Sequence, residues 1–183
     1  MLMTLVVQVE NKPGVLNRVA SLFRRRGFNI ESLTVGHTEK PGISRMTIVV
    51  DTDELGILRL EANLFKLIHV LSVENVTSTP SVFRDLAMIK VCATPENRAG
   101  IMQLAQVFRA RIVDVNSESL VIESTGAEDK IDGLIEVLRG FGILELARTG
   151  RVAMTRGRSG EVSTAETYRE DDLMEDQSVS YSV

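Results

Sequence analysis

The spacing of apolar residues near the start of the chain changes from alternation to a helical period. This change predicts a strand, a turn and a helix in succession. Residues 4–10 place successive side chains on alternate faces, with three apolar side chains on one face, which is typical of a half-buried strand. Residues 11–14 predict a turn, and from Val15 the apolar positions recur at helical spacing until Gly27, which is placed to cap the helix end. The positions expected to face a core are Leu5, Val7 and Val9 in the strand, and Val15, Leu16, Val19, Ala20, Leu22 and Phe23 in the helix.

The next residues predict the remainder of one folding unit. The runs FNIESLTVG and SRMTIVV read as two strands joined through the turn at Pro41 and Gly42. Asp53 can cap a second helix over residues 54–68, and VLSVENVTS predicts a fourth strand. The core-facing positions expected on this second helix are Leu55, Leu58, Ala62 and Phe65.

The resulting order is β-α-β-β-α-β, which predicts a ferredoxin-like α+β sandwich with both helices on one face of an antiparallel sheet. Val6, Val49 and Leu33 are expected on the other face. An apolar face of this kind is not expected to stay bare, so the pattern predicts pairing or stacking with a second copy.

The same order recurs after the break at Thr79, Pro80 and Ser81, which predicts a second ferredoxin-like unit. The segments GVLNRVASLFR and GIMQLAQVFR echo each other, and both duplication and convergence on one fold remain open explanations. We therefore expect domains at residues 1–79 and 80–157, and an acidic, disordered tail at 158–183. The elements expected in the second domain are strands at 83–93, 111–116, 118–124 and 143–148 and helices at 97–109 and 128–140.

Composition and charge exclude several functions. The apolar content of 44% in 183 residues is enough for a core, and the formal net charge is −4. The tail holds seven acidic residues and two arginines, so the rest of the chain has 18 acids against 19 bases and lacks the positive field that nucleic-acid binding requires. The first ten residues lack a basic segment and stop being apolar at Glu10, so they predict neither a signal peptide nor a membrane span, and we expect a soluble chain.

Residues that could carry chemistry are scarce. Cys92 is the single cysteine and lies in a strand-like run, where it is expected to be a small buried hydrophobe in a reducing compartment. His37 and His69 have no second ligand at metal spacing, so no metal site is expected. The sequence also lacks the phosphate-binding, zinc-protease and nucleophile-elbow motifs, which argues against any catalytic residue in this chain.

The turn before the first helix has what binding of a free amino acid requires. Pro13 fixes its φ angle and Gly14 lets a ligand approach the backbone, so the N–H groups that open the helix are available to a carboxylate. Asn11 and Asn29 each offer a carbonyl for an ammonium group and an NH2 for a carboxylate. An apolar pocket for a small aliphatic side chain would be lined by Val15, Leu16 and Ile30.

Simpler interpretations stand beside this one. Pro13 and Gly14 can form an ordinary turn, and Asn29 can bridge backbone groups. The run Arg24 to Arg26 could bind phosphate or a partner, but its place in the last helical turn favours solvent-exposed bases that complement the helix dipole.

The run VENKPGVLNRVASLFRRRGFNIESLTVGHTEKPGISRMTIVV resembles the N-terminal ACT domain of the small regulatory subunit of acetohydroxyacid synthase, also called acetolactate synthase. GFNIESLTVGHT followed by SRMTI is more specific to that family than to ACT domains at large. VFRARIVDV and ELARTGRVAMTRG extend the resemblance through residue 157, and nothing in the tail matches.

The resemblance implies a non-catalytic subunit of branched-chain amino-acid biosynthesis. It would activate the large catalytic subunit, which holds thiamine diphosphate, Mg and FAD, and mediate feedback inhibition by valine, with leucine and isoleucine as other candidate effectors. It also implies a homodimer with continuous sheets, and a cytoplasmic location or, for a chloroplast-encoded form, the plastid stroma. The effector-binding residues implied are Asn11, Lys12, Pro13, Gly14, Val15 and Leu16, with Asn29 and Ile30 contributed by the paired domain.

Two other functions remain as alternatives. One is a stand-alone ACT amino-acid sensor that controls another protein. The other is a ferredoxin-like hydrolase that uses Asn29 and Arg18, although the position of Arg18 within the helix argues against a phosphate cradle.

Overall fold

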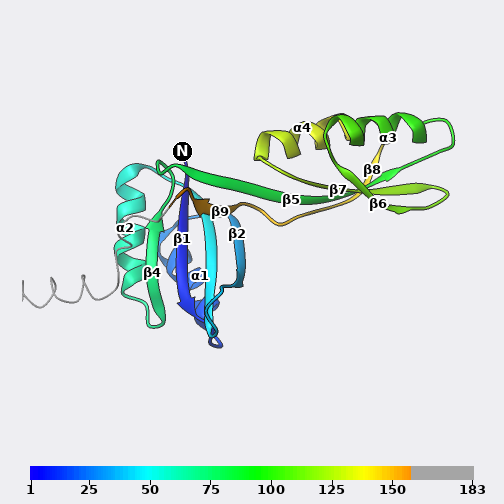
Figure 1. Cartoon of the computed structure of the whole chain (residues 1–183). Helices are drawn as coiled ribbons and strands as arrows, with labels where there is room; N and C mark the ends of the chain where they lie inside the picture. The colour runs from blue at the N-terminus through cyan, green and yellow to red at the C-terminus, as the bar shows by residue number, and fades with distance from the viewer. Residues whose placement is uncertain (158–183) are drawn as a thin grey trace, which may run out of the picture. The chain divides into compact units, whose positions relative to one another are not determined.

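A computed structural model describes residues 1–157 and divides the chain into two compact units (Figure 1). The first unit is Met1–Ser81 together with residues 153–157, and the second is Val82–Val152. Each contains the predicted β-α-β-β-α-β order. The strands are β1 Leu2–Glu10, β2 Ile30–His37, β3 Ile43–Asp51, β4 Val70–Asn75, β5 Ser81–Cys92, β6 Arg111–Val115, β7 Ser119–Gly126, β8 Ile143–Arg148 and β9 Val152–Thr155, and the helices are α1 Val15–Arg26, α2 Glu54–Phe65, α3 Arg98–Val107 and α4 Glu128–Arg139.

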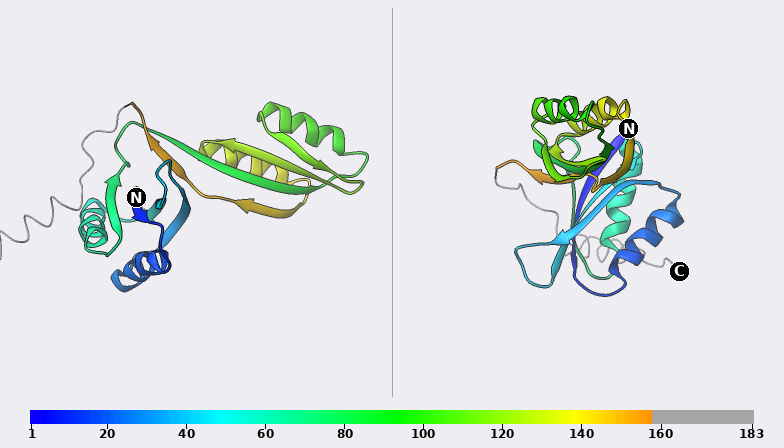
Figure 2. Two further views of the ribbon diagram at one scale, coloured as in Figure 1. Left: turned by 60° about the horizontal axis from the view of Figure 1, so that its bottom comes forward. Right: turned by 90° about the vertical axis from the view of Figure 1, so that its right-hand side faces the viewer.

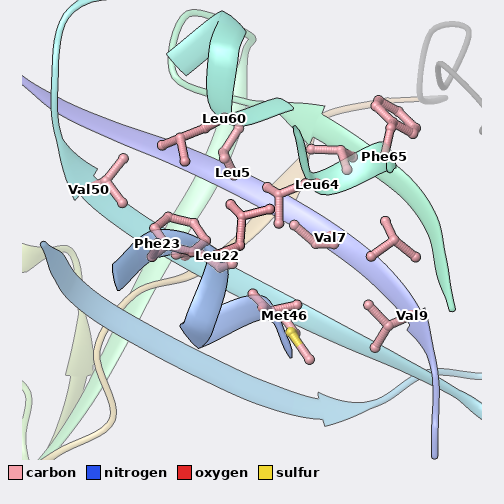
Figure 3. Packing of buried hydrophobic residues seen from close by; sticks show 14 of the residues in the cluster. Leu5, Val7, Val9, Leu22, Phe23, Met46, Val50, Leu60, Leu64 and Phe65 are labelled. Carbon is pink, nitrogen blue, oxygen red and sulfur yellow. The ribbon is translucent and has the colours of Figure 1, made fainter. Parts of the chain in front are cut away.

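The first unit is a four-stranded antiparallel sheet in the order β2-β3-β1-β4, with α1 and α2 packed on one face. The predicted core face of β1 is confirmed, because Leu5, Val7 and Val9 belong to the helix-covered core and are at most 1% exposed. Figure 3 shows these side chains in one cluster with Phe23 of α1 and Leu60 of α2. The strand is not half-buried as predicted, since Thr4 and Val6 on its other face are 1% and 2% exposed. Burial of large aliphatic side chains between the layers supplies the main stabilisation of the unit.

The predicted helix caps are confirmed. The Asp53 side chain accepts a hydrogen bond from the Gly56 N–H at 2.7 Å, which satisfies a donor left free at the start of α2. Gly27 ends α1 with a φ of 74°, in the left-handed region that glycine adopts without strain.

The expected core face of α2 is wrong at Leu55 and Leu58, although Phe65, also predicted to face the core, is buried. Leu55 and Leu58 are 64% and 59% exposed, whereas Ile57, Leu60 and Leu64 are at most 2% exposed. Apolar residues occur on both sides of this helix, so the sequence period alone fits either face, and packing against the sheet selects the stripe at i, i+3 and i+7.

The first turn of α1 and the end of α2 also depart from expectation. Leu16 is 44% exposed and lies outside the α1 core stripe of Val15, Val19, Leu22 and Phe23. The second helix ends at Phe65, three residues before its predicted end. A turn through Leu67 follows and leads to His69, whose φ is 74°.

The second face of this sheet differs from the prediction of an apolar surface left for another copy. Val6 and Val49 lie on that face and are 2% and 3% exposed within the single chain. Leu33 lies opposite Ile48 and packs against the helix-covered core, so its predicted face is wrong. The register of β2 places Leu33 inward, and the burial of Val6 and Val49 leaves less apolar surface on this face than expected, whereas pairing with a second copy stays a prediction.

The sequence pattern does not predict strand β9. Its residues from Ala153 to Thr155 belong to the first unit. The Arg45 guanidinium donates from Nη2 to the Ala153 carbonyl at 2.9 Å, and the Arg156 N–H donates to the Pro80 carbonyl at 2.8 Å. Burial lowers the pKa of Arg45, although Glu74 and Glu39 oppose that shift. This return of the chain therefore covers a polar part of β3.

The sheet of the second unit has the strand order β6-β7-β5-β8, which repeats the topology of the first. Strand β9 pairs with β5, whose first residue, Ser81, belongs to the first unit. Figure 2 shows α3 and α4 on one face of this sheet. Ile89 and Ile122 face each other across β5 and β7, and with Ile101 and Leu134 of the helices they are fully buried. The predicted fold class of two ferredoxin-like units is confirmed.

An ion-pair cluster joins β8 to β5 and α4 within the second unit. Arg148 donates from Nε to Asp85 Oδ2 at 2.8 Å and from Nη1 to Asp132 Oδ1 at 2.7 Å. Burial on its own would lower the pKa of Arg148, but its hydrogen bonds to the two carboxylates raise it. Arg151 pairs with Glu128 beside this cluster and stacks 5.2 Å from the Phe83 ring centroid.

Candidate functional site

The turn between β1 and α1 has a fixed backbone conformation. The Asn11 N–H donates to the Gly42 carbonyl at 2.7 Å, and the Lys12 N–H donates to the Glu10 carbonyl at 2.9 Å. Gly14 is the residue before the helix and has a φ of 82°, a conformation that residues with a Cβ adopt at a cost. The turn is therefore held at its first two residues and depends on glycine at its last position.

The helix start leaves backbone donors free. No side chain caps α1, and within residues 1–157 no backbone acceptor is found for the N–H groups of Gly14, Leu16 and Asn17. The Val15 N–H has only a long contact of 3.4 Å to the Lys12 carbonyl. N–H groups at a helix start, reinforced by the helix dipole, form a binding site for anions such as a carboxylate.

Space in front of these donors is open. Asn11, Lys12, Pro13 and Gly14 are exposed, and a Cβ built on Gly14 would meet no atom within 4 Å. Val15 is only 3% exposed and packs in the core, so it can offer a ligand its backbone but little of its side chain.

Charged groups next to the turn are paired among themselves. Lys12 Nζ lies 2.5 Å from Glu10 Oε2, and His69 Nδ1 lies 3.2 Å from the same oxygen. The Lys12 hydrogen bond lowers the pKa of Glu10, with a smaller contribution from His69. Glu10 thus stays ionised, and its charge offsets that of Lys12 beside the helix start.

The two remaining predicted residues lie at the other end of α1 within one chain. Asn29 and Ile30 follow the helix C-terminus, whereas the turn precedes its N-terminus, and the 12 residues of α1 span about 18 Å. Asn29 Nδ2 donates to Glu31 Oε1 at 2.5 Å, which leaves its carbonyl oxygen available. A single copy therefore does not bring the eight predicted residues together.

The edge of the first sheet is open at β2. This strand pairs with β3 on one side and has no strand on its other side within the described residues. Val35, Gly36 and His37 at its end are exposed. An edge of this kind can accept another strand by backbone hydrogen bonds.

The structure also reveals groups at the helix start and at β2 that the sequence interpretation did not name. Asn17 contributes the third free N–H of the helix start, and Glu31 is the carboxylate that orients Asn29. Helix-start geometry could have indicated Asn17, since the first four N–H groups of a helix have no acceptor within the helix. The Asn29–Glu31 contact depends on how β2 begins, which the sequence pattern does not report.

Other chemistry is sparse in the part of the chain that the structure describes. Residues 1–157 contain no group of three or more His, Cys, Asp or Glu side chains placed to hold a metal ion. Cys92 is half-buried in β5, less enclosed than expected. None of the four helices has both the length and the apolar character needed to cross a bilayer.

Comparison with known proteins places both units in one family. Residues 5–72 match the ACT domain of the small subunit of acetohydroxyacid synthase, and residues 84–157 match the family described as the small subunit of acetolactate synthase. A probable acetolactate synthase small subunit of Archaeoglobus fulgidus is 56% identical over 154 residues, which cover 84% of this chain and 96% of that protein. The acetolactate synthase small subunit of Mycolicibacterium smegmatis is 48% identical, with 86% and 92% covered.

Among solved structures, the acetolactate synthase small subunit of Thermotoga maritima has a TM-score of 0.81 and 41% sequence identity. The likeness covers 87% of this chain and 99% of that one. The resemblance first suggested by the run from Val9 to Val50 is confirmed over both units.

Proposed function

The chain belongs to the small-subunit family of acetolactate synthase, and from this premise we propose that it is the non-catalytic regulatory subunit that activates the large catalytic subunit and transmits feedback inhibition by valine. The single observation that carries the effector assignment is the open helix start, where Gly14, Leu16 and Asn17 present free N–H groups in front of exposed space. Thiamine diphosphate, Mg and FAD would be held by the large subunit.

The chemistry of the turn fits a neutral zwitterion. The ligand carboxylate would accept hydrogen bonds from the N–H groups of the helix start, and carboxamide oxygens of Asn11 and Asn29 would accept from its ammonium group. Lys12, already paired with Glu10, would add no net charge to the site. Pro13 and Gly14 would shape the backbone around the carboxylate, and the half-exposed Leu16 would contact the aliphatic side chain with Ile30.

Dimerisation through β2 would unite the two halves of the site. β1 ends at Glu10 at the same end of the sheet where β2 ends at His37, and Ile30 lies at the opposite end. If two β2 edges pair antiparallel about a twofold axis, Asn29 and Ile30 of the second copy come to the end of the sheet that carries the turn. Within one chain the turn and Asn29 are separated by the length of α1, about 18 Å. For this reason binding would require two copies.

Regulation would follow from a preference of valine for one arrangement of this dimer. An effector shifts an equilibrium only by the difference in its affinity for the two states, and a coupling of about 1–3 kcal/mol changes affinity by roughly five- to 150-fold. We propose that residues 1–79 form the domain that binds the effector and dimerises, and that residues 80–157 form a regulatory domain that completes the response.

The test of the effector site uses two substitutions at one residue. Gly14→Asp and Gly14→Asn introduce the same backbone strain, about 1 kcal/mol at a positive φ, where Asp and Asn are better tolerated than other residues. Only Asp adds a negative charge beside the ligand carboxylate. Calorimetric titration with valine should give an affinity at least tenfold lower for Gly14→Asp than for Gly14→Asn.

Equal valine affinities of the two variants would mean that the carboxylate does not bind at the helix start. Titration with leucine and isoleucine would rank the effectors in the same experiment. Co-purification with the catalytic subunit, and loss of valine inhibition of that complex in Gly14→Asp, distinguish the regulatory subunit from a stand-alone sensor.

A further inference from the structure

A basic groove lies on the helical face of the first unit. Two adjoining hollows of about 500 and 400 Å³ share Arg25, Lys66 and Leu67 in their walls. No acidic residue lines either hollow. The five bases that line them, which we call the basic groove, are Arg18, Arg24, Arg25 and Arg26 of α1 and Lys66 after α2.

The bases of the groove are not neutralised within the described chain. None of the five forms an ion pair with a carboxylate of residues 1–157, and Arg26 donates instead to the neutral Asn63 side chain at 2.7 Å. Helix α1 contains four arginines and no acidic residue. Five bases along one groove, without a carboxylate partner in residues 1–157, create a local positive potential that attracts an anionic partner.

Helix electrostatics explain only part of this cluster. Arg24, Arg25 and Arg26 occupy the last turn of α1, where positive charge complements the dipole, as the sequence interpretation favoured. Arg18 lies in the first half of the helix, where a base gains nothing from the dipole. Its presence in the groove points to an occupant outside the helix.

The chain itself supplies a segment of the opposite charge. Residues 158–183 contain seven acidic residues and two arginines, and five of the acids fall between Glu170 and Asp176. This segment begins where the described chain ends on the first unit, the unit that carries the basic groove. It also lies beyond the residues matched by either family comparison, which end at 157.

The segment is long enough to reach the groove. Glu170 to Asp176 lie 13 to 19 residues beyond Gly157, which corresponds to roughly 45–60 Å of extended chain. A unit of about 80 residues is only about 30 Å across. The route around the edge of the sheet to its helical face is therefore within reach, and attachment to the same chain raises the local concentration of the acids.

We propose that the acidic segment Glu170 to Asp176 docks in the basic groove of its own chain and neutralises it. The contact is electrostatic, because it joins exposed arginines and Lys66 to carboxylates, and it weakens as ionic strength rises. The proposal concerns the helical face of the unit and does not depend on the effector site at the start of α1.

Zero-length carbodiimide cross-linking of the full chain tests this contact, because it joins a lysine to a carboxylate with which it is paired. Lys66 is the reactive lysine of the groove, and Lys12, Lys40, Lys90 and Lys130 are internal references elsewhere. Mass spectrometry should find Lys66 joined to residues 170–176 at least fivefold more often than any reference lysine, and about 0.5 M salt should suppress the product at least fivefold.

A charge-reversal variant provides the matched control. Arg24→Glu/Arg25→Glu keeps Lys66 as the reporter and should lower its cross-link yield at least fivefold. Arg84→Glu/Arg139→Glu makes the same change in net charge on exposed residues of the second unit and should leave the yield unchanged.

Three results would overturn the proposal. One is a Lys66 yield no higher than that of the reference lysines. Another is a product that forms only between isotopically light and heavy chains in a mixed sample, which would assign the contact to another copy. The third is a cross-link from Lys66 to residues 170–176 that persists undiminished in Arg24→Glu/Arg25→Glu, which would mean that the groove does not hold the segment.

Discussion

Replacing Arg148 by Met removes the guanidinium from the ion-pair cluster of the second unit while keeping an unbranched side chain of similar length. The main consequence falls on Asp85, whose side chain is 4% exposed and receives Arg148 Nε at 2.8 Å and Nη2 at 2.5 Å. Asp132 also loses its partner, but that side chain is 56% exposed and water can replace the hydrogen bond.

The expected loss of unfolding free energy is about 2–4 kcal/mol. A buried ion pair broken on one side costs about 3–5 kcal/mol, because the remaining charge is left without a partner. Arg148 is 27% exposed, so its removal admits some water to Asp85 and lowers the expected cost. A second substitution, Asp85→Leu, removes the orphaned carboxylate and should recover at least about 1 kcal/mol of the loss.

Amide hydrogen exchange read by mass spectrometry measures this effect within one unit. Peptides from Val82–Val152 should open more readily in Arg148→Met, while peptides from Met1–Ser81 serve as the internal reference. Arg139→Met is the matched control, since its pair with Glu136 is exposed on both sides and should contribute less than about 0.5 kcal/mol. A loss in Arg148→Met no greater than that in Arg139→Met would refute the reasoning.

Two further predictions concern α2. Leu60→Ala should lower the unfolding free energy by about 2–5 kcal/mol, because Leu60 is fully buried. Leu58→Ala should lower it by less than about 0.5 kcal/mol, because Leu58 is 59% exposed. Equal losses of the two variants in urea unfolding would contradict the observed core face. Burial raises the pKa of Glu61, although the Asn75 backbone opposes the shift, so its ionisation disfavours the folded state as pH rises through the raised pKa. Glu61→Gln should therefore raise the melting temperature at pH 7 but have little effect near about pH 3.5, and the reverse order would exclude this assignment.

The sequence pattern predicts the fold correctly where the spacing of the apolar residues is compatible with only one buried face. The core face of β1 and the cap at Asp53 each have one reading, and the structure agrees with both. In α2 the apolar residues surround the helix, and only contact with the sheet distinguishes Leu60 from Leu58. Strand β9 is four residues long and is stabilised by pairing with β5, which is distant in the sequence. A local hydrophobic pattern carries no information about such pairing.

The candidate site was predictable to a different extent. Pro13 and Gly14 indicate a turn at a helix start, and the positive φ of Gly14 gives the physical reason for glycine there. The open donors at Leu16 and Asn17 follow from general helix geometry. The position of Asn29 relative to the turn does not follow from spacing, because it depends on which edge of the sheet is free.

That free edge has a consequence for how the regulatory response can arise. Within one chain Asn29 and the turn lie at opposite ends of α1, so a ligand that contacts both must also contact two copies. Its affinity then depends on the relative position of the two β2 edges, and any change in that position alters the geometry of the site. By reciprocity, a bound effector stabilises the dimer arrangement that binds it best, which is the property that a feedback subunit requires.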